Sequence, residues 1–312
     1  MAITRSRKIL SDLYTIFLFT RADIVIALLP VTLFSIAAAP LSSPIRLIDT
    51  IFWIWLHLLQ FNVANQIKAP EEDKINKPSR PIPAGRITVH DATILRWTLV
   101  PICLAYSALY SPQLMWVSLT MLLFTMWYNE NDGDKESFSK NFLTAIMYGL
   151  SEIGGTLVAG HDHTQVSPTG RIAAEVTVIV FASTLHAQDF RDASGDRLTE
   201  RRSFPILYPV ASRIAIGLAI PLWSIFLSLM WQLDLLCASA FIAYGCFTGA
   251  RFLLYHTVED DRRSCKHYSL WFSLHHLFPA YWYYFHGTNE FPGTEFIEKI
   301  VASTAGVIGG SQ

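Results

Sequence analysis

Residues 61–86, FNVANQIKAPEEDKINKPSRPIPAGR, join an apolar segment to a basic, proline-rich loop. Three amide side chains, Asn62, Asn65 and Gln66, appear while the surrounding sequence is still apolar. Polar side chains within an apolar span usually face the protein interior or a water-filled cavity. This junction therefore predicts a polar site at one end of a bundle of apolar helices.

The composition is typical of a membrane protein. Of the 312 residues, 52% are hydrophobic and 16% are charged, against roughly 25% charged residues in an ordinary soluble domain. The net charge of -1 gives no indication of a nucleic-acid partner. The four cysteines form no CxxC pair, so we expect neither a disulfide framework nor a thiolate metal site. No feature of the sequence indicates an obligate protein partner.

Nine apolar segments are each near the length of about 20 residues that a helix needs to cross a bilayer. Only helices satisfy the backbone of such segments within lipid, so the fold class is predicted to be all-α and polytopic. We expect one membrane-embedded domain over residues 1–312, with the site capped by loops 68–90 and 187–207. The nine predicted spans are Ile16–Ala39, Ile48–Ile67, Ala92–Tyr110, Leu114–Tyr128, Phe142–Ala159, Ile172–Gln188, Ile214–Trp231, Leu235–Tyr255 and Tyr268–Phe285.

Lysine and arginine are concentrated on one side of these spans. The N-terminus and the loops after even-numbered spans carry most of them, whereas the other side carries little beyond Arg46, Arg171 and Lys299. The positive-inside rule then places the N-terminus and the even-numbered loops in the cytosol. The first polar stretch, 61–86, and a second one, residues 186–202, both lie on that side.

The second polar stretch reads HAQDFRDASGDRLTERR. Asp189, Asp192 and Asp196 have the spacing i, i+3, i+7, which puts three carboxylates on one face of a helix. Such carboxylates repel each other unless a cation lies among them, and hard oxygen ligands suit Mg²⁺, which typically adds phosphate oxygens and water. The interleaved Arg191 and Arg197 could bind phosphate directly. The alternative is a solvated helix end whose acids and bases pair locally.

The first stretch continues with acids and then bases. Glu72 and Asp73 are candidate metal ligands, and Asp73 joins Asp189 and Asp192 as a candidate catalytic residue. Pro70 predicts a break or bend in the helix. We expect the two polar stretches to face each other and to hold a metal-bound diphosphate between them. The candidate residues for binding this diphosphate in the first stretch are Asn65, Gln66, Lys74, Lys77 and Arg80.

A purely structural interpretation of this stretch is a polar helix end followed by a basic loop on anionic lipid headgroups. Under that interpretation, Lys77–Gly85 (KPSRPIPAG) is an extended, stiff connector. The presence of a second acidic motif on the same side of the membrane favours a functional site.

The two motifs together resemble those of the UbiA superfamily of intramembrane prenyltransferases. The resemblance lies in NQxxxxxEDKINKPSRPIPAG, followed by DxxDxxGDR. It implies nine helices around a central cavity, with Mg²⁺ and a prenyl diphosphate held by two Asp-rich motifs. The usual first motif of the family is NDxxDxxxD; here Gln66 and Ala69 replace its first two acids, Asp73 matches the third, and Glu72 is an additional acid.

This departure makes an enzyme of the quinone-biosynthesis type less favoured. The variant is similar to the fungal branch that includes UbiA-type sesquiterpene cyclases, which implies cyclisation of farnesyl diphosphate and, for a fungal chain, residence in the endoplasmic reticulum. One alternative is transfer of a prenyl group to an aromatic or lipid-like acceptor. A second is a non-catalytic transporter or lipid-binding protein, which does not explain two acidic motifs at the ends of two different spans.

Aromatic and ionisable residues within the spans are further candidates. A carbocation needs a dry pocket with π-faces, and nine aromatic residues could supply them: Phe52, Trp53, Trp55, Phe61, Phe124, Trp127, Tyr128, Tyr148 and Phe181. His57 and His186 could take part in deprotonation or make structural hydrogen bonds. We interpret His267, His275, His276 and His286 as interfacial, and Arg21 and Asp23 as paired with each other or with headgroups.

Overall fold

The computed structural model describes residues 2–68, 70–198 and 202–287. This part of the chain is built from helices and contains no β-strand, which confirms the all-α prediction. The α-helices are α1 (Ala2–Thr20), α2 (Leu29–Ala38), α3 (Pro44–Lys68), α4 (Pro70–Asn76), α5 (Val89–Ala108), α6 (Pro112–Asn129), α7 (Ser137–Ala159), α8 (Pro168–Thr184), α9 (Asp189–Leu198), α10 (Phe204–Leu207), α11 (Pro209–Met230), α12 (Leu235–Leu254), α13 (Val258–His275) and α14 (Phe278–His286).

Six stretches of the described chain are long and apolar enough to cross a bilayer. They correspond to the first, second and fifth to eighth predicted spans: Arg7–Ala38, Pro44–Lys68, Ser137–Ala159, Pro168–Ala193, Pro209–Met230 and Leu235–Leu254. The other three predicted spans coincide with α5, with α6 and with parts of α13 and α14. The chain is an integral membrane protein, and the number nine stays a prediction.

Two predicted spans are interrupted. The first contains a 3₁₀ turn, Arg21–Asp23, and a π-helical turn, Ile24–Leu28, between α1 and α2. The ninth was placed at Tyr268–Phe285, but α13 already starts at Val258, where Thr257 accepts a hydrogen bond from the Asp260 amide as the N-cap. It ends at His275, and a separate helix, α14, starts at Phe278 with Pro279 in its first turn, where the missing N–H of proline costs nothing.

Polar caps fix where several helices begin. Ser111, Ser167 and Asp234 accept hydrogen bonds from backbone amides in the first turns of α6, α8 and α12. These amides have no partner within their own helix, so a side-chain acceptor there stabilises the helix start. Two of the caps are followed by a proline, Pro112 or Pro168, whose missing N–H costs nothing at this position.

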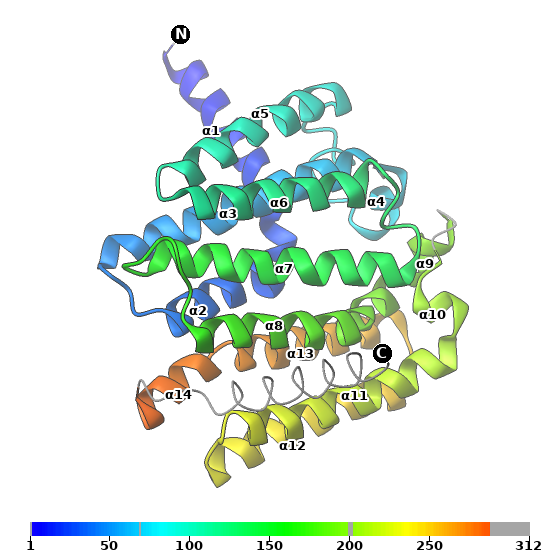
Figure 1. The fold of residues 1–312 in the computed structure, drawn as a ribbon. Coiled ribbons are helices and arrows are strands. Elements are labelled where there is room, and N and C mark those ends of the chain that lie inside the picture. Colours follow the sequence, from blue (N-terminus) through cyan, green and yellow to red (C-terminus); the bar gives the residue numbers. More distant parts are fainter. Residues whose placement is uncertain (1, 69, 199–201, 288–312) are drawn as a thin grey trace, which may run out of the picture.

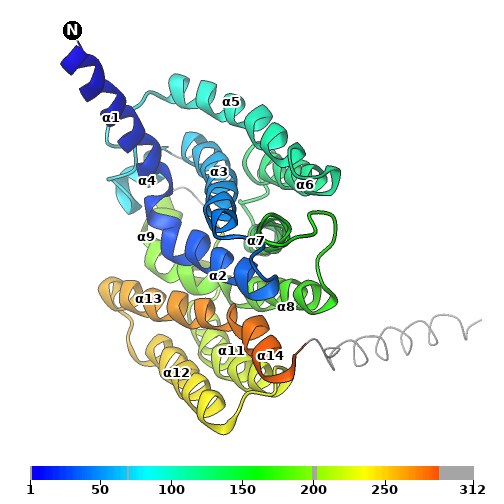
Figure 2. The ribbon, with the colours of Figure 1, turned by 90° about the vertical axis from the view of Figure 1, so that its left-hand side faces the viewer.

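Helix α7 lies at the centre of the bundle. It packs against α2, α3, α6 and α8, and Figure 2 shows it nearly end on between α3 and α8. Gly154 and Gly155 permit close contact on this helix: a Cβ atom on Gly154 would lie 2.1 Å from the Trp53 ring, and one on Gly155 would lie 2.2 Å from Ser35 Oγ. The glycine pair thus holds α2 and α3 directly against α7.

The two acidic motifs meet at one end of this bundle, which we call the polar end. Figure 1 shows α4, α9 and α10 at the same end, where α3 finishes and α7 starts. The proline-rich segment after α4 is turned, so the prediction of an extended connector was wrong. Backbone hydrogen bonds from Arg80 N to Lys77 O and from Ala84 N to Arg80 O fold it back towards α4.

Candidate active site

A cavity of about 230 Å³ opens at the polar end and runs into the bundle. Residues of α3, α6, α7 and α8 and of the irregular turns before α2 surround it. The part of the cavity next to the polar end is lined by charged residues, and the deeper part is largely apolar. We call the mouth the six charged residues Asp73, Lys77, Arg80, Lys140, Asp189 and Asp192.

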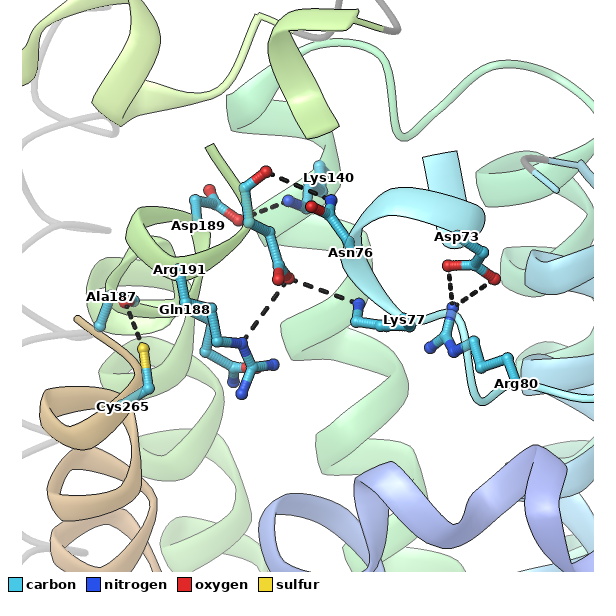
Figure 3. Close-up of polar contacts among 11 residues, drawn as sticks. Asp73, Asn76, Lys77, Arg80, Lys140, Ala187, Gln188, Asp189, Arg191 and Cys265 are labelled. Atoms are coloured by element: carbon cyan, nitrogen blue, oxygen red, sulfur yellow. Dashed lines mark hydrogen bonds and ion pairs between the residues drawn. The ribbon is translucent and has the colours of Figure 1, made fainter. Parts of the chain in front are cut away.

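The three α9 acids, Asp189, Asp192 and Asp196, all line the cavity, and the first two contact bases. Asp189 Oδ1 lies 2.6 Å from Lys140 Nζ of α7. Asp192 Oδ2 lies 3.4 Å from Lys77 Nζ and 3.7 Å from Arg191 Nε. Figure 3 shows Lys140 beside Asp189, with Lys77 reaching across from the loop after α4.

The first motif contributes a third ion pair. Arg80 Nη1 donates to both carboxylate oxygens of Asp73, at 2.8 and 2.9 Å, and the two side chains face each other in Figure 3. Both residues are less than 10% exposed. The turned proline-rich segment makes this contact possible, because it brings Arg80 back over α4.

Backbone contacts join the two motifs. Asn76 Nδ2 donates to the Asp192 carbonyl oxygen at 3.3 Å. Gly195 lies directly beneath this amide, since a Cβ atom there would be 2.1 Å from Asn76 Nδ2. A glycine at this position therefore allows α4 and α9 to close over the cavity.

The structure brings nine of the twelve predicted site residues to the cavity lining. They are Asn65, Glu72, Asp73, Lys77, Arg80, Asp189, Arg191, Asp192 and Asp196. The other three lie elsewhere. Gln66 is fully buried and donates to the Phe19 carbonyl oxygen at 3.1 Å, Lys74 pairs with Glu71 in solvent at 2.7 Å, and Arg197 is exposed.

Two charged residues of the lining were missed by the sequence analysis. Lys140 stands in the first turn of α7 and reaches the second motif. Asp23 belongs to the 3₁₀ turn and accepts a hydrogen bond from Asn62 Nδ2 at 2.8 Å, which replaces the expected pairing with Arg21 or headgroups. The one available signal for Asp23 was its position as an ionisable residue near the start of an apolar span.

A loop beside the mouth holds the start of α7. Lys68 Nζ lies 2.5 Å from Asp134 and 3.0 Å from Asp132. The hydrogen bond from Lys135, followed by that from Lys68, lowers the pKa of the exposed Asp132 carboxyl below its usual value. Ser137 donates to the Arg202 carbonyl oxygen, which ties the same loop to the segment after α9.

Four of the nine candidate aromatic residues line the cavity: Phe61, Tyr128, Tyr148 and Phe181. Tyr148 and Phe181 are in contact, with ring centroids 4.7 Å apart. Phe52 and Trp127 are instead 42% and 51% exposed on the outer surface.

His57 also lines the cavity, and both of its ring nitrogens are bound by the protein. Nδ1 lies 2.8 Å from the Trp53 carbonyl oxygen and must donate to it, because a carbonyl only accepts. Nε2, 2.7 Å from Ser118 Oγ, then accepts from that hydroxyl. This arrangement supports the structural alternative for His57.

The interpretation of His275 and His276 as interfacial was wrong, since they are 4% and 0% exposed. His276 Nε2 lies 2.9 Å from Oε1 of Glu152, a fully buried acid of α7. His276 Nδ1, 2.7 Å from the Phe272 carbonyl oxygen, must donate there. The contact joins α7 to the C-terminal end of α13 and places an acid beside a base at a depth where a lone charge would be costly.

The carboxylates at the cavity entrance fit a divalent cation. Asp189 Oδ2 is buried and accepts no hydrogen bond from the described residues, and Asp192 and Asp196 lie on the same helix face. No three His, Cys, Asp or Glu side chains of the described chain form a complete metal site. Mg²⁺ is usually bound by one or two protein carboxylates together with substrate phosphates and water.

Fold and site together define a membrane-embedded enzyme whose charged mouth opens onto a deep apolar cavity. The sequence profile of the UbiA prenyltransferase family matches residues 27–274. The chain belongs to this family, as its two motifs indicated.

Individual relatives and a solved structure are consistent with membership of this family. A fumagillin beta-trans-bergamotene synthase from Aspergillus fumigatus is 32% identical over 87% of this chain and 93% of its own length. A diterpene cyclase from Hericium erinaceus is 29% identical, covering 71% and 74%, and a polyprenyl transferase from the same fungus is 30% identical, covering 68% and 75%. A UbiA homologue from Archaeoglobus fulgidus, solved with GPP and Mg²⁺, shares the fold with a TM-score of 0.62 at 13% identity, covering 85% of this chain and 99% of its own.

Proposed function

We propose that this chain is a Mg²⁺-dependent terpene cyclase that ionises farnesyl diphosphate and cyclises the resulting carbocation to a sesquiterpene hydrocarbon. The observation that carries the proposal is the mouth, where three acids are paired with three bases directly above an aromatic-walled cavity. The names of the bergamotene synthase and the diterpene cyclase support cyclisation as the reaction class.

The bases of the mouth have a defined task in this reaction. Lys77, Arg80 and Lys140 each neutralise a carboxylate in the ligand-free protein. When a diphosphate enters, their N–H groups can exchange the carboxylate for phosphate oxygens, with Arg suited to bidentate contacts. Fixed cationic donors around the departing diphosphate stabilise the charge that develops as the allylic C–O bond breaks.

The three acids released by this exchange would hold the metal together with two further acids of the cavity lining. Asp73, Asp189, Asp192, Asp196 and Glu72 are the proposed ligands, and bound Mg²⁺ would offset the charge of the diphosphate. Asn65 lines the cavity, and its side-chain amide would donate to the diphosphate.

The deeper cavity protects the carbocation. Its walls are largely apolar or aromatic, which limits the water that would otherwise capture the cation. The faces of Tyr148, Phe181 and Phe61 offer negative π-density to the migrating positive charge. Loss of a proton from a carbon beside the cationic centre then gives the alkene.

Prenyl transfer to an aromatic or lipid-like acceptor is the second candidate. The 30% identity to a polyprenyl transferase favours it, and both reactions begin with the same ionisation. The two differ only in whether a second molecule captures the cation.

The decisive experiment uses microsomes that contain this chain, Mg²⁺ and farnesyl diphosphate alone, with mass spectrometry of the headspace and organic extract. A cyclic hydrocarbon absent from empty-vector microsomes is expected. Turnover only after a phenolic or lipid acceptor is added would identify the transferase instead. Failure of a non-hydrolysable farnesyl diphosphate analogue to bind in the presence of Mg²⁺ would contradict both and leave a transporter or lipid-binding role.

We further propose that the polar end faces the cytosol from the endoplasmic reticulum membrane. The distribution of lysine and arginine supports the orientation, and the fungal relatives support the compartment. Cysteine-accessibility labelling of Ser79→Cys in sealed microsomes tests it, because label reaches that loop from outside the vesicle only in this orientation.

A further inference from the structure

The cavity has a definite deep end. On α3 its lining runs from Asn65 to Ile54, and on α7 from Lys140 to Ser151. Each pair is eleven positions apart, which at the rise of about 1.5 Å per residue of an α-helix corresponds to about 16 Å. Val31 of α2 closes the same level and is 1% exposed. We call Val31, Ile54 and Ser151 the floor.

Backbone packing blocks the space beneath the floor. Gly154 and Gly155 follow Ser151 by one helical turn, and their missing side chains let Trp53 and Ser35 fill the positions where a continued channel would lie. Trp53 is fully buried, and its Nε1 donates to Ser107 Oγ at 2.9 Å, which fixes the indole in place.

The Glu152–His276 pair holds the helices together next to the floor. Glu152 is the residue after Ser151, and its contact with His276 joins α7 to α13 at this depth. The His276 ring also packs against Phe34 of α2, with centroids 6.1 Å apart. Both α2 and α13 are therefore held against α7 where the cavity ends.

We propose that the floor sets the length of the prenyl chain that this enzyme accepts. The inference rests on the proposed function, since it assumes that the diphosphate is bound at the mouth. A depth of about 16 Å below the acids is close to the extended length of three isoprene units and shorter than that of four. A chain of four units meets Ile54 and Val31 before its diphosphate reaches the bases, whereas a chain of two leaves the deep end empty.

The floor offers substitutions with opposite predicted effects. Ile54→Ala removes three carbons from the deep end and should admit a longer chain. Ser151→Leu adds bulk at the same level and should favour a shorter one. Ile51→Ala is the matched control, because Ile51 lies one turn away on the same helix but is 38% exposed on its outer face.

The test measures Mg²⁺-dependent diphosphate release from geranyl, farnesyl and geranylgeranyl diphosphates for the wild type and each variant. We expect Ile54→Ala to raise the geranylgeranyl-to-farnesyl ratio of kcat/KM about tenfold, and Ser151→Leu to raise the geranyl-to-farnesyl ratio about tenfold, because pocket size discriminates by such factors. Ile51→Ala should keep the wild-type ratios. Ile54→Val provides a milder change in the same direction if the alanine variant does not fold.

The possible failures can be told apart. Folded, active floor variants that keep the wild-type ratios would overturn the role of the floor and leave the proposed function standing. A folded wild-type protein that releases diphosphate from none of the three substrates would overturn the proposed function itself.

Discussion

An acid is paired with a base both at the mouth of the cavity and next to its floor, but the two pairs differ in what they do. At the mouth, Asp189 and Lys140 form an ion pair that a competing anion or cation can separate. Near the floor, Glu152 and His276 contact each other and are both completely buried. The first pair keeps charge available for a ligand, whereas the second places an acid beside a base where a lone charge would be costly.

The difference shows how position determines what an acid can do. The charges at the polar end line an open cavity, so a ligand that enters can offer each of them a new partner of opposite charge. The same charge in the middle of a span would be expensive unless neutralised. We therefore expect substitutions at the mouth to change turnover, and substitution of Glu152 or His276 to change stability.

The largest effect is expected for Asp192→Ala. This change removes a proposed metal ligand and the partner of Lys77, and product formation should fall at least about 100-fold, the scale of losing one electrostatic contact in a transition state. Circular dichroism and size-exclusion chromatography in detergent should show a folded protein. Retained turnover in a folded Asp192→Ala sample would remove the metal interpretation.

Lys140→Met tests the residue that sequence reasoning missed. It leaves Asp189 without its base and removes one proposed donor to the diphosphate, so kcat/KM should fall about tenfold, as for loss of a hydrogen bond to a charged group. Steady-state kinetics at saturating Mg²⁺ measures the change. Lys135→Met, in the neighbouring loop and outside the cavity lining, is the control and should retain wild-type kinetics.

Glu152→Ala tests the buried Glu152–His276 pair next to the floor. His276 Nε2 would lose its partner in a buried site, which costs about 1–3 kcal/mol. A lower thermal unfolding midpoint in detergent is expected, with the Mg²⁺ concentration for half-maximal activity unchanged. A shifted Mg²⁺ requirement with an unchanged unfolding midpoint would show that the two ends of the cavity are not separate in function.

The smallest effect is expected at Asp234, which caps α12 away from both regions. Its hydrogen bonds, first to the Cys237 amide, hold the pKa of the carboxyl at about 2. Because the folded pKa lies below the ordinary value of 3.8, this stabilisation is present above pH 4 and is lost as the pH falls through about 2. Asp234→Asn should therefore have a slightly lower unfolding midpoint at pH 7, and the difference from wild type should shrink between pH 4 and pH 2; a constant difference would contradict the cap.

The mouth was largely predictable because its information is local. The spacing of Asp189, Asp192 and Asp196 fixes a common helix face whatever surrounds it. Lys140 and Asp23 come from other helices, and only the tertiary arrangement brings them to the same cavity. Asn65 and Gln66 are neighbours that point about 100° apart, and an apolar span gave no indication of which one faces the cavity.

The packing that closes the deep end of the cavity could not be predicted from the sequence. The need for glycine at positions 154 and 155 is visible only in the structure, where the Trp53 and Ser35 side chains occupy the space that larger residues would fill. The pairing of Glu152 with His276 joins residues more than a hundred positions apart. Their burial is decided by packing, not by local pattern.

The π-helical turn at Ile24–Leu28 has a consequence for how this protein can change over evolution. Such a turn accommodates one residue more than a regular helical turn. Deletion of one residue from a regular α-helix rotates everything before it by about 100°, whereas deletion within a π-helical turn returns that turn to a regular α-helical one. Asp23 then keeps its position beside Asn62, and the Phe19 carbonyl keeps its contact with Gln66. We therefore expect a single-residue deletion to be tolerated better in this turn than in the regular part of α3.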